Sequence, residues 1–334
     1  MMRARKTGVV LGLAAVTLGA AACGGSGDSG GKVRLSLVAY STPQAAYEAI
    51  IKEYQKTSEG KNVTFTKSFG ASGEQSRAVA SGLKADIVAF SLEPDMTRLV
   101  DAGLVDASWN SGPEKGMVTD SVVVLATRKG NPKNVKTWDD LLKPGVQVIT
   151  PNPFTSGGAQ WNIMAGYGAK ANKGADKAAG TAYLRSLFKN VPVQDSSARK
   201  SLQTFSGGKG DVLLAYENEA IFAQQNNQPL DYTVPDSTIL IENPVAVTKK
   251  SQNQAEAQAF LKFLHGKKAQ EIFVKNGYRP TTDGVPGAEK FPNPPGLFTI
   301  TDLGGWPKVK KEFFDPKGSI MADVEKSIGV SVDG

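Results

Sequence analysis

Apolar runs rich in β-branched residues alternate along this chain with segments of helical period. VRLSLVAY (33–40), NVTFTKSF (62–69) and ADIVAFS (85–91) are typical of strands, and each precedes a run of helical spacing. The same order returns later, where strand-like runs occupy 121–130, 146–153, 210–216 and 238–250. A repeated strand–helix order predicts an α/β fold with a mostly parallel sheet.

The repeats form two blocks, which two long apolar runs at 121–127 and 238–248 connect. If the chain enters the second block through one run and returns through the other, two lobes form with a cleft between them. We expect a first lobe of residues 33–120 plus 249–334 and a second lobe of residues 121–248. A single long amphipathic helix is expected at 256–277.

The N-terminus has the three parts of an export signal. MMRARK is basic, TGVVLGLAAVTLG is apolar, and the small residues Ala20, Ala21 and Ala22 precede a cleavage site. LGAAAC is similar to a lipobox, which predicts that residues 1–22 are removed and that lipidated Cys23 anchors an extracytoplasmic protein to the cell membrane. Residues 23–32, rich in Gly and Ser, predict a flexible tether. A plain secretory signal, with Cys23 near the cut by chance, is the alternative.

Composition and missing motifs disfavour several classes of function. Cys23 and His265 are the only Cys and His in 334 residues, so neither an internal disulfide nor a Cys/His zinc cluster can form. The net charge of +7 falls to +4 when Arg3, Arg5 and Lys6 of the signal are removed. The chain has no basic run with interleaved aromatic residues, so binding to nucleic acid is not indicated. The chain has no P-loop motif, which disfavours a P-loop NTPase. The GxSxG motif of acyl-transfer hydrolases is incomplete at residues 70–74. We expect His265 to be an exposed helix residue and Glu217 and Glu219 to be structural, so an enzyme is disfavoured.

Three strand-like runs are followed by small hydroxyl or glycine residues where the next helical run begins. These residues are Ser41-Thr42, Ser72-Gly73 and Ser156-Gly157-Gly158. The first turn of a helix has free backbone N–H groups and a partial positive charge, Ser adds an O–H donor, and Gly allows close approach. Since open α/β sheets bind ligands at the carboxyl ends of their strands, these helix starts predict an anion site. Ordinary capping at all three positions is the alternative.

Longer motifs in the chain resemble a known family. GASGEQ (70–75), NPFTSGGAQWN (152–162), DSSARK (195–200) and GDVLLAYENEA (210–220) are similar to the bacterial sulfate-binding proteins of ABC importers, over about residues 33 to 320. The resemblance implies a two-lobed type II periplasmic-binding-protein fold with the ligand in the interlobe cleft. It also implies no cofactor, an ABC permease as partner, and a monomer. The implied ligand-binding residues are Ser41, Ser72, Ser156, Gly157, Gly158, Ala198 and Tyr216. Arg199 is expected as a supporting charge beside them, or else as a surface or interlobe ion pair.

Two of these positions depart from the family pattern. Ser41 stands where the family usually has Asp, and Tyr216 stands where it usually has Trp. Both departures also resemble molybdate-binding proteins, so molybdate or tungstate is an alternative ligand, and a sensory lipoprotein is an alternative role. Sulfate carries no proton, so a site made only of hydrogen-bond donors satisfies all its oxygens. The O–H of protonated phosphate would find no acceptor there, which costs about 1–3 kcal/mol of binding free energy. We therefore expect capture of sulfate, or of thiosulfate, for an ABC importer.

Overall fold

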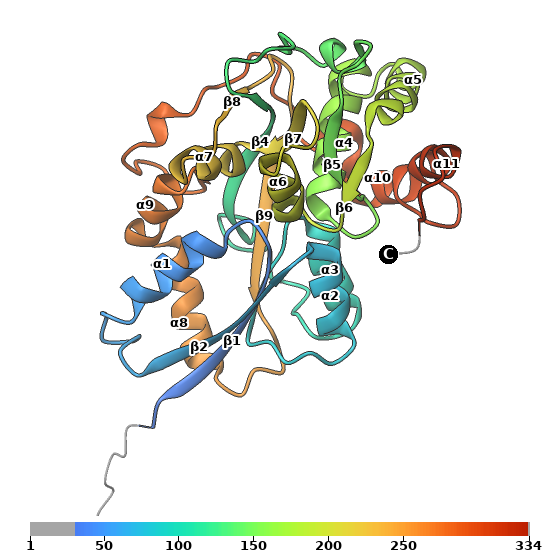
Figure 1. Cartoon of the computed structure of the whole chain (residues 1–334). Helices are drawn as coiled ribbons and strands as arrows, with labels where there is room; N and C mark the ends of the chain where they lie inside the picture. Colours follow the sequence, from blue (N-terminus) through green and yellow to red (C-terminus); the bar gives the residue numbers. More distant parts are fainter. Residues whose placement is uncertain (1–30, 333–334) are drawn as a thin grey trace, which may run out of the picture. The chain divides into compact units, whose positions relative to one another are not determined.

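A computed structural model describes residues 31–332 of the chain. Within them, ten strands join one sheet in the order β2-β1-β3-β9-β4-β7-β5-β6, and β8 and β10 both pair with β4 (Figure 1). The strands are β1 (Val33–Tyr40), β2 (Val63–Gly70), β3 (Ile87–Ala89), β4 (Met117–Arg128), β5 (Val148–Pro151), β6 (Val193–Asp195), β7 (Val212–Tyr216), β8 (Leu230–Thr233), β9 (Leu240–Val247) and β10 (Arg279–Pro280). The prediction of an α/β fold is confirmed.

Helices follow most of these strands. They are α1 (Gln44–Tyr54), α2 (Ser72–Ala80), α3 (Glu93–Asp101), α4 (Gly157–Lys170), α5 (Lys177–Leu187), α6 (Ala198–Ser206), α7 (Glu217–Gln225), α8 (Gln254–His265), α9 (Lys267–Lys275), α10 (Gly305–Phe313) and α11 (Ile320–Ser327). The prediction of one long helix at 256–277 is wrong. Gly266 has an extended backbone, with φ −73° and ψ 150°, and separates α8 from α9 although the apolar period continues through it.

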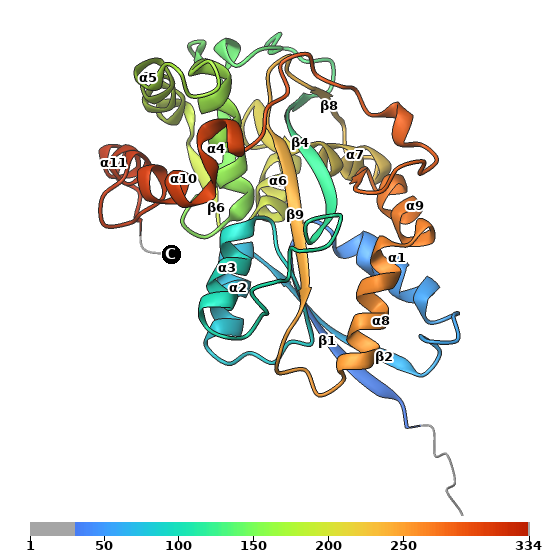
Figure 2. The ribbon, with the colours of Figure 1, turned by 180° about the vertical axis from the view of Figure 1, so that it is seen from behind.

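Parallel pairing is confined to the two flanks of the sheet. β1 pairs in parallel with β2 and β3, and β5 pairs in parallel with β6 and β7. The central strands β4 and β9 are antiparallel to each other and to their outer neighbours β7 and β3, which corrects the expectation of a mostly parallel sheet. β4 and β9 are the two apolar runs predicted to connect the blocks, and they extend between the two flanks (Figures 1 and 2).

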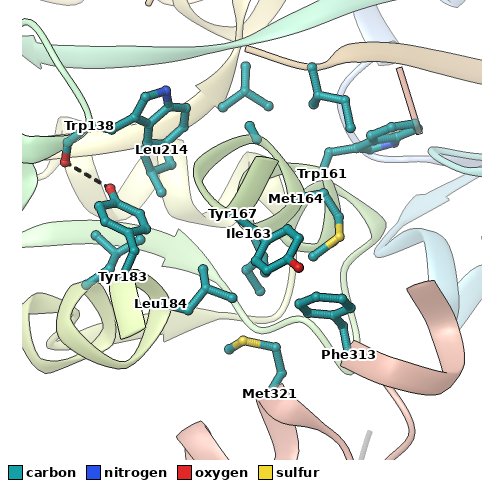
Figure 3. Packing of buried hydrophobic residues seen from close by; sticks show 14 of the residues in the cluster. Trp138, Trp161, Ile163, Met164, Tyr167, Tyr183, Leu184, Leu214, Phe313 and Met321 are labelled. Atoms are coloured by element: carbon teal, nitrogen blue, oxygen red, sulfur yellow. Dashed lines mark hydrogen bonds between the residues drawn. The ribbon is translucent and has the colours of Figure 1, made fainter. Parts of the chain in front are cut away.

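Each flank has its own buried side chains. α1, α8 and α9 lie together beside β1 and β2 (Figure 2), where Tyr54 meets Phe260 with ring centroids 5.0 Å apart. On the other flank α4 is buried among α5, α10 and α11, and Figure 3 shows Tyr167 of α4 facing Phe313 of α10. Their centroids are 4.6 Å apart. The predicted first lobe includes residues 249–334. α8 and α9 pack there, whereas α10 and α11 pack with α4 and α5, and the lobe boundaries stay a prediction.

None of the helices within residues 31–332 is long and apolar enough to cross a membrane. Residues 1–30, which include the predicted signal and Cys23, lie outside the described part of the chain.

Candidate functional site

The ends of several strands and the first turns of the following helices surround one small cavity, here called the central cavity. Its free volume is about 10 Å³, so in this structure its walls lie almost against one another. The described residues that line it are Tyr40, Ser41, Thr42, Ala71, Ser72, Ser91, Ser156, Gly158, Ala198 and Tyr216. None of these ten residues carries a charge. The convergence follows from the topology, because the carboxyl ends of parallel strands meet at one edge of a sheet.

Six of the seven residues predicted to bind the ligand line this cavity. Gly157 does not, but it packs tightly beside it, since a Cβ at this position would lie 2.7 Å from Ser91 Oγ. The structure therefore brings together the residues that the sequence singled out, and their contact with a ligand stays a prediction. The sequence analysis named Thr42 at a helix start but missed Tyr40, Ala71 and Ser91, although Tyr40 and Ser91 are the last residues of predicted strands.

Among the helix starts at the cavity, α6 has a side-chain cap, since Ser197 Oγ accepts from the backbone N–H of Lys200 at 3.4 Å, but the three starts named in the sequence analysis have none. α1, α2 and α4 lack a side-chain hydrogen bond to their first turn, whereas α5 and α11 are capped by Asp176 and Ser319. At α1 the N-cap position falls on Pro43, and Thr42 Oγ1 lies 3.1 Å from the Tyr278 hydroxyl instead. Ordinary capping by Ser or Thr therefore does not account for these residues, and the N–H groups of the first turns have no intrahelical partner.

The hydroxyl of Ser72 has partners inside the protein. Its Oγ donates to Asp95 Oδ2 at 2.6 Å and accepts from the backbone N–H of Ser91 at 2.9 Å. Asp95 also accepts from Arg98 Nη1 at 2.9 Å. We had expected this hydroxyl to face the ligand. In this structure it supports the turn after β3, and the backbone N–H groups of the first turn are the donors left at the start of α2.

Ser91 connects the two sides of the cavity. Its Oγ lies 2.6 Å from the Tyr216 hydroxyl, so residues that follow β3 and end β7 meet in one hydrogen bond. The backbone oxygen of Ser91 accepts from Trp161 Nε1 at 2.8 Å and from Asn243 Nδ2 at 2.9 Å. Burial raises the pKa of Tyr216 well above its ordinary value, so the phenol stays protonated and able to donate.

Arg199 lies behind the cavity rather than in its wall. It makes a bidentate pair with Glu219, with Nε and Nη2 at 2.9 and 2.7 Å from the carboxylate oxygens. Nη2 also donates to the backbone oxygen of Thr42 at 2.8 Å. The guanidinium thus ties α6 and α7 to the loop after β1, which fits a supporting charge. Glu217 is likewise engaged, with Arg279 Nε at 2.9 Å.

His265 departs from its expected position. It is partly buried at the end of α8 rather than exposed, and burial lowers its pKa. It does not line the central cavity. Within residues 31–332, no group of three or more His, Cys, Asp or Glu side chains is arranged to hold a metal ion.

A family profile described as bacterial extracellular solute-binding protein matches residues 35–279. Together with the fold and the strand-end cavity, this match shows that the chain belongs to the bacterial extracellular solute-binding proteins. The structure of the sulfate-binding protein SubI from Mycobacterium tuberculosis H37Rv superimposes with a TM-score of 0.83 and 42% identity, over 85% of this chain and 100% of that one.

Sequence relatives narrow the class. A sulfate-binding protein of Synechococcus elongatus is 44% identical over 89% of this chain and 90% of its own length. One from Escherichia coli is 39% identical over 86% and 92%, and a thiosulfate-binding protein of Pseudomonas aeruginosa is 34% identical over 80% and 84%. Within its class, the chain groups with the sulfate-binding proteins. These relatives are solute-binding proteins, not enzymes.

Proposed function

We propose that this chain captures sulfate outside the cytoplasm and delivers it to an ABC importer. The observation that carries the proposal is the wall of the central cavity, whose ten residues are uncharged and include backbone and hydroxyl donors at several helix starts. The sulfate-binding relatives at 39–44% identity support the same ligand.

The geometry suits a fully deprotonated dianion. The first turns of α2, α4 and α6 present N–H groups together with the positive ends of their helix dipoles. The carboxylates nearest the wall already have partners, since Asp95 accepts from Ser72 and Glu219 pairs with Arg199. A bound oxyanion therefore meets donors and no free carboxylate, and a ligand with its own O–H finds only hydroxyl oxygens, which would then no longer donate to it.

Calorimetry of the mature soluble chain tests this proposal. Sulfate should bind about tenfold to about 100-fold more tightly than phosphate near pH 7, because an unpaired buried O–H costs about 1–3 kcal/mol. Thiosulfate and molybdate are titrated separately in the same way. Equal affinity for sulfate and phosphate would contradict the argument from missing acceptors, and a preference for molybdate would overturn the choice of ligand.

Attachment to the membrane is a separate part of the proposal. The lipobox-like LGAAAC and the Gly/Ser-rich run after it support a lipid anchor at Cys23. In cells, Cys23→Ser should move the protein from the membrane fraction to the soluble extracytoplasmic fraction. If the variant still sediments with membranes to the same extent as wild type, the anchor is not at Cys23.

A further inference from the structure

A second cavity lies beside the central one, and its lining is charged where that of the central cavity is uncharged. This basic cavity, of about 580 Å³, is lined by the cations Arg77, Arg98, Lys310 and Lys311, and among the described residues Asp315 is the one carboxylate in its wall. The cations come from α2, α3 and α10, and Figure 2 shows α10 close to α3. The two cavities share no lining residue.

Two of the cations have weak partners. Arg77 Nη1 is 3.5 Å from the backbone oxygen of Phe154, and Lys310 Nζ is 3.4 Å from Gln160 Oε1. Neither forms an ion pair among those found in residues 31–332. Burial is the main cause of the lowered pKa of Lys310; the carboxylate of Asp95 opposes this shift, and the positive charges of Arg98 and Arg77 add to it. The four cations outnumber the two nearby carboxylates, Asp95 and Asp315, and this excess favours a ligand that brings negative charge.

Arg98 contributes charge and a fixed position. Its Nη1 donates to Asp95 Oδ1 at 2.9 Å and to Ser76 Oγ at 2.8 Å, which holds the guanidinium at the wall. Asp95 in turn accepts from Ser72, which lines the central cavity. The apolar rings of Phe154 and Phe314 form other parts of the wall, so the basic cavity can accommodate more than a bare ion.

We propose that the basic cavity is a second oxyanion site, in which Arg77, Arg98 and Lys310 bind a free sulfate- or phosphate-bearing anion. The site is distinct from the central cavity, and the proposal does not depend on which anion the central cavity binds. Because its donors are charged side chains, it accepts a protonated or unprotonated oxyanion, and its affinity falls as salt rises.

Equilibrium dialysis at low ionic strength tests the proposal, with inorganic phosphate and phenyl phosphate as separate probes and one equivalent of sulfate present. Lys310→Gln and Arg77→Gln should each weaken phosphate binding about tenfold, since each removes a charge-assisted hydrogen bond. Lys308→Gln is the matched control, because it removes the same charge from α10 outside the cavity. Melting temperatures of all variants establish that the fold is intact, and Arg98 is left unchanged because it also holds Asp95.

The outcomes separate the two cavities. Binding that is lost in Lys310→Gln and Arg77→Gln but kept in Lys308→Gln and Gly157→Ala supports the second site. If phenyl phosphate binds more tightly than inorganic phosphate, the aromatic side chains of the wall contact the organic part of the ligand. Equal affinities would indicate that the site binds the inorganic ion. Phosphate binding that is absent in wild type, equal in all variants, or lost only in Gly157→Ala overturns the proposal. The sulfate affinity measured by calorimetry reports independently on the central cavity.

Discussion

The central and basic cavities lie close together but differ in the donors that they present. The central cavity has ten uncharged residues in its wall, many of them at helix starts whose backbone is fixed by the fold. The basic cavity has long side chains with full charges, two of which have only weak partners. Fixed neutral donors impose geometry and protonation state on a ligand, whereas charged side chains supply attraction with little discrimination. The difference indicates that net positive charge and anion selectivity can reside at separate places in one protein.

The largest expected effect comes from adding a methyl group beside the central cavity. In Gly157→Ala the new Cβ would lie 2.7 Å from Ser91 Oγ and 2.8 Å from Leu92 Cδ2, so the turn after β3 must shift. Sulfate affinity measured by calorimetry should fall by about 100-fold. Gly112→Ala, where a Cβ meets nothing within 4 Å, should bind as wild type does. An unchanged affinity in Gly157→Ala would show that close packing at this helix start is not required.

Two serines at helix starts should respond differently. Ser156 makes no capping hydrogen bond, so Ser156→Ala should weaken sulfate binding about tenfold with little change in the free energy of unfolding. Ser72→Ala removes the partner of Asp95 and of the Ser91 N–H, and should lower the free energy of unfolding by about 1–3 kcal/mol. Chemical denaturation and calorimetry measure the two quantities, with exposed Ser111→Ala as control. Equal stability losses in Ser72→Ala and Ser156→Ala would contradict this assignment.

Loss of the hydrogen bond between Tyr216 and Ser91 should reduce sulfate affinity less than these changes do. Tyr216→Phe and Ser91→Ala each remove it, and each should weaken sulfate binding about fivefold because a neutral hydrogen bond contributes about 0.5–1.5 kcal/mol. The double variant should be no weaker than the weaker single variant, since both changes remove the same contact. Additive losses in this cycle would instead mean that each hydroxyl contacts the anion separately.

The smallest expected effect is a difference in how the anion affinities of the two cavities depend on pH. Lys310, which faces Arg77, Arg98, Asp95 and Asp315, has a lowered pKa that burial causes first of all. Sulfate binding in the basic cavity favours the charged amine, so affinity there should fall as pH rises towards the lowered pKa of Lys310, at a lower pH than for an ordinary lysine. Sulfate affinity in the central cavity should stay nearly constant over the same range, because its two tyrosines have raised pKa values. A parallel loss of both affinities would mean that one group controls both sites.

Local patterns were sufficient for much of the fold. The period of 33–40 and 210–216 identifies β1 and β7, and the Ser and Gly residues after strands indicate where the central cavity forms. Local patterns fail where tertiary contacts decide the outcome. The amphipathic period runs through Gly266, so it does not show that α8 ends there. Thr42 resembles a cap by position, but its hydroxyl is close to Tyr278, 236 residues away in sequence.

The same limit applies to the sites. Ser72 looks like a ligand donor because it begins a helix, yet its hydroxyl donates a hydrogen bond to Asp95, and no spacing rule connects the two residues. The basic cavity is still less visible in sequence, since Arg77, Arg98 and Lys310 lie on three helices that are brought together by the fold. Arg199 could be placed near the site from its neighbour Ala198, whereas its bond to the Thr42 backbone oxygen could not.

The indole of Trp161 gives the protein a built-in fluorescent probe. Its Nε1 donates to the backbone oxygen of Ser91, at the wall of the central cavity, and its ring meets Trp306 with centroids 4.7 Å apart. Indole emission depends on the polarity and hydrogen bonding around the ring. We therefore expect an anion that displaces Ser91 to change the emission of Trp161, which a variant without the other three tryptophans would report without a label.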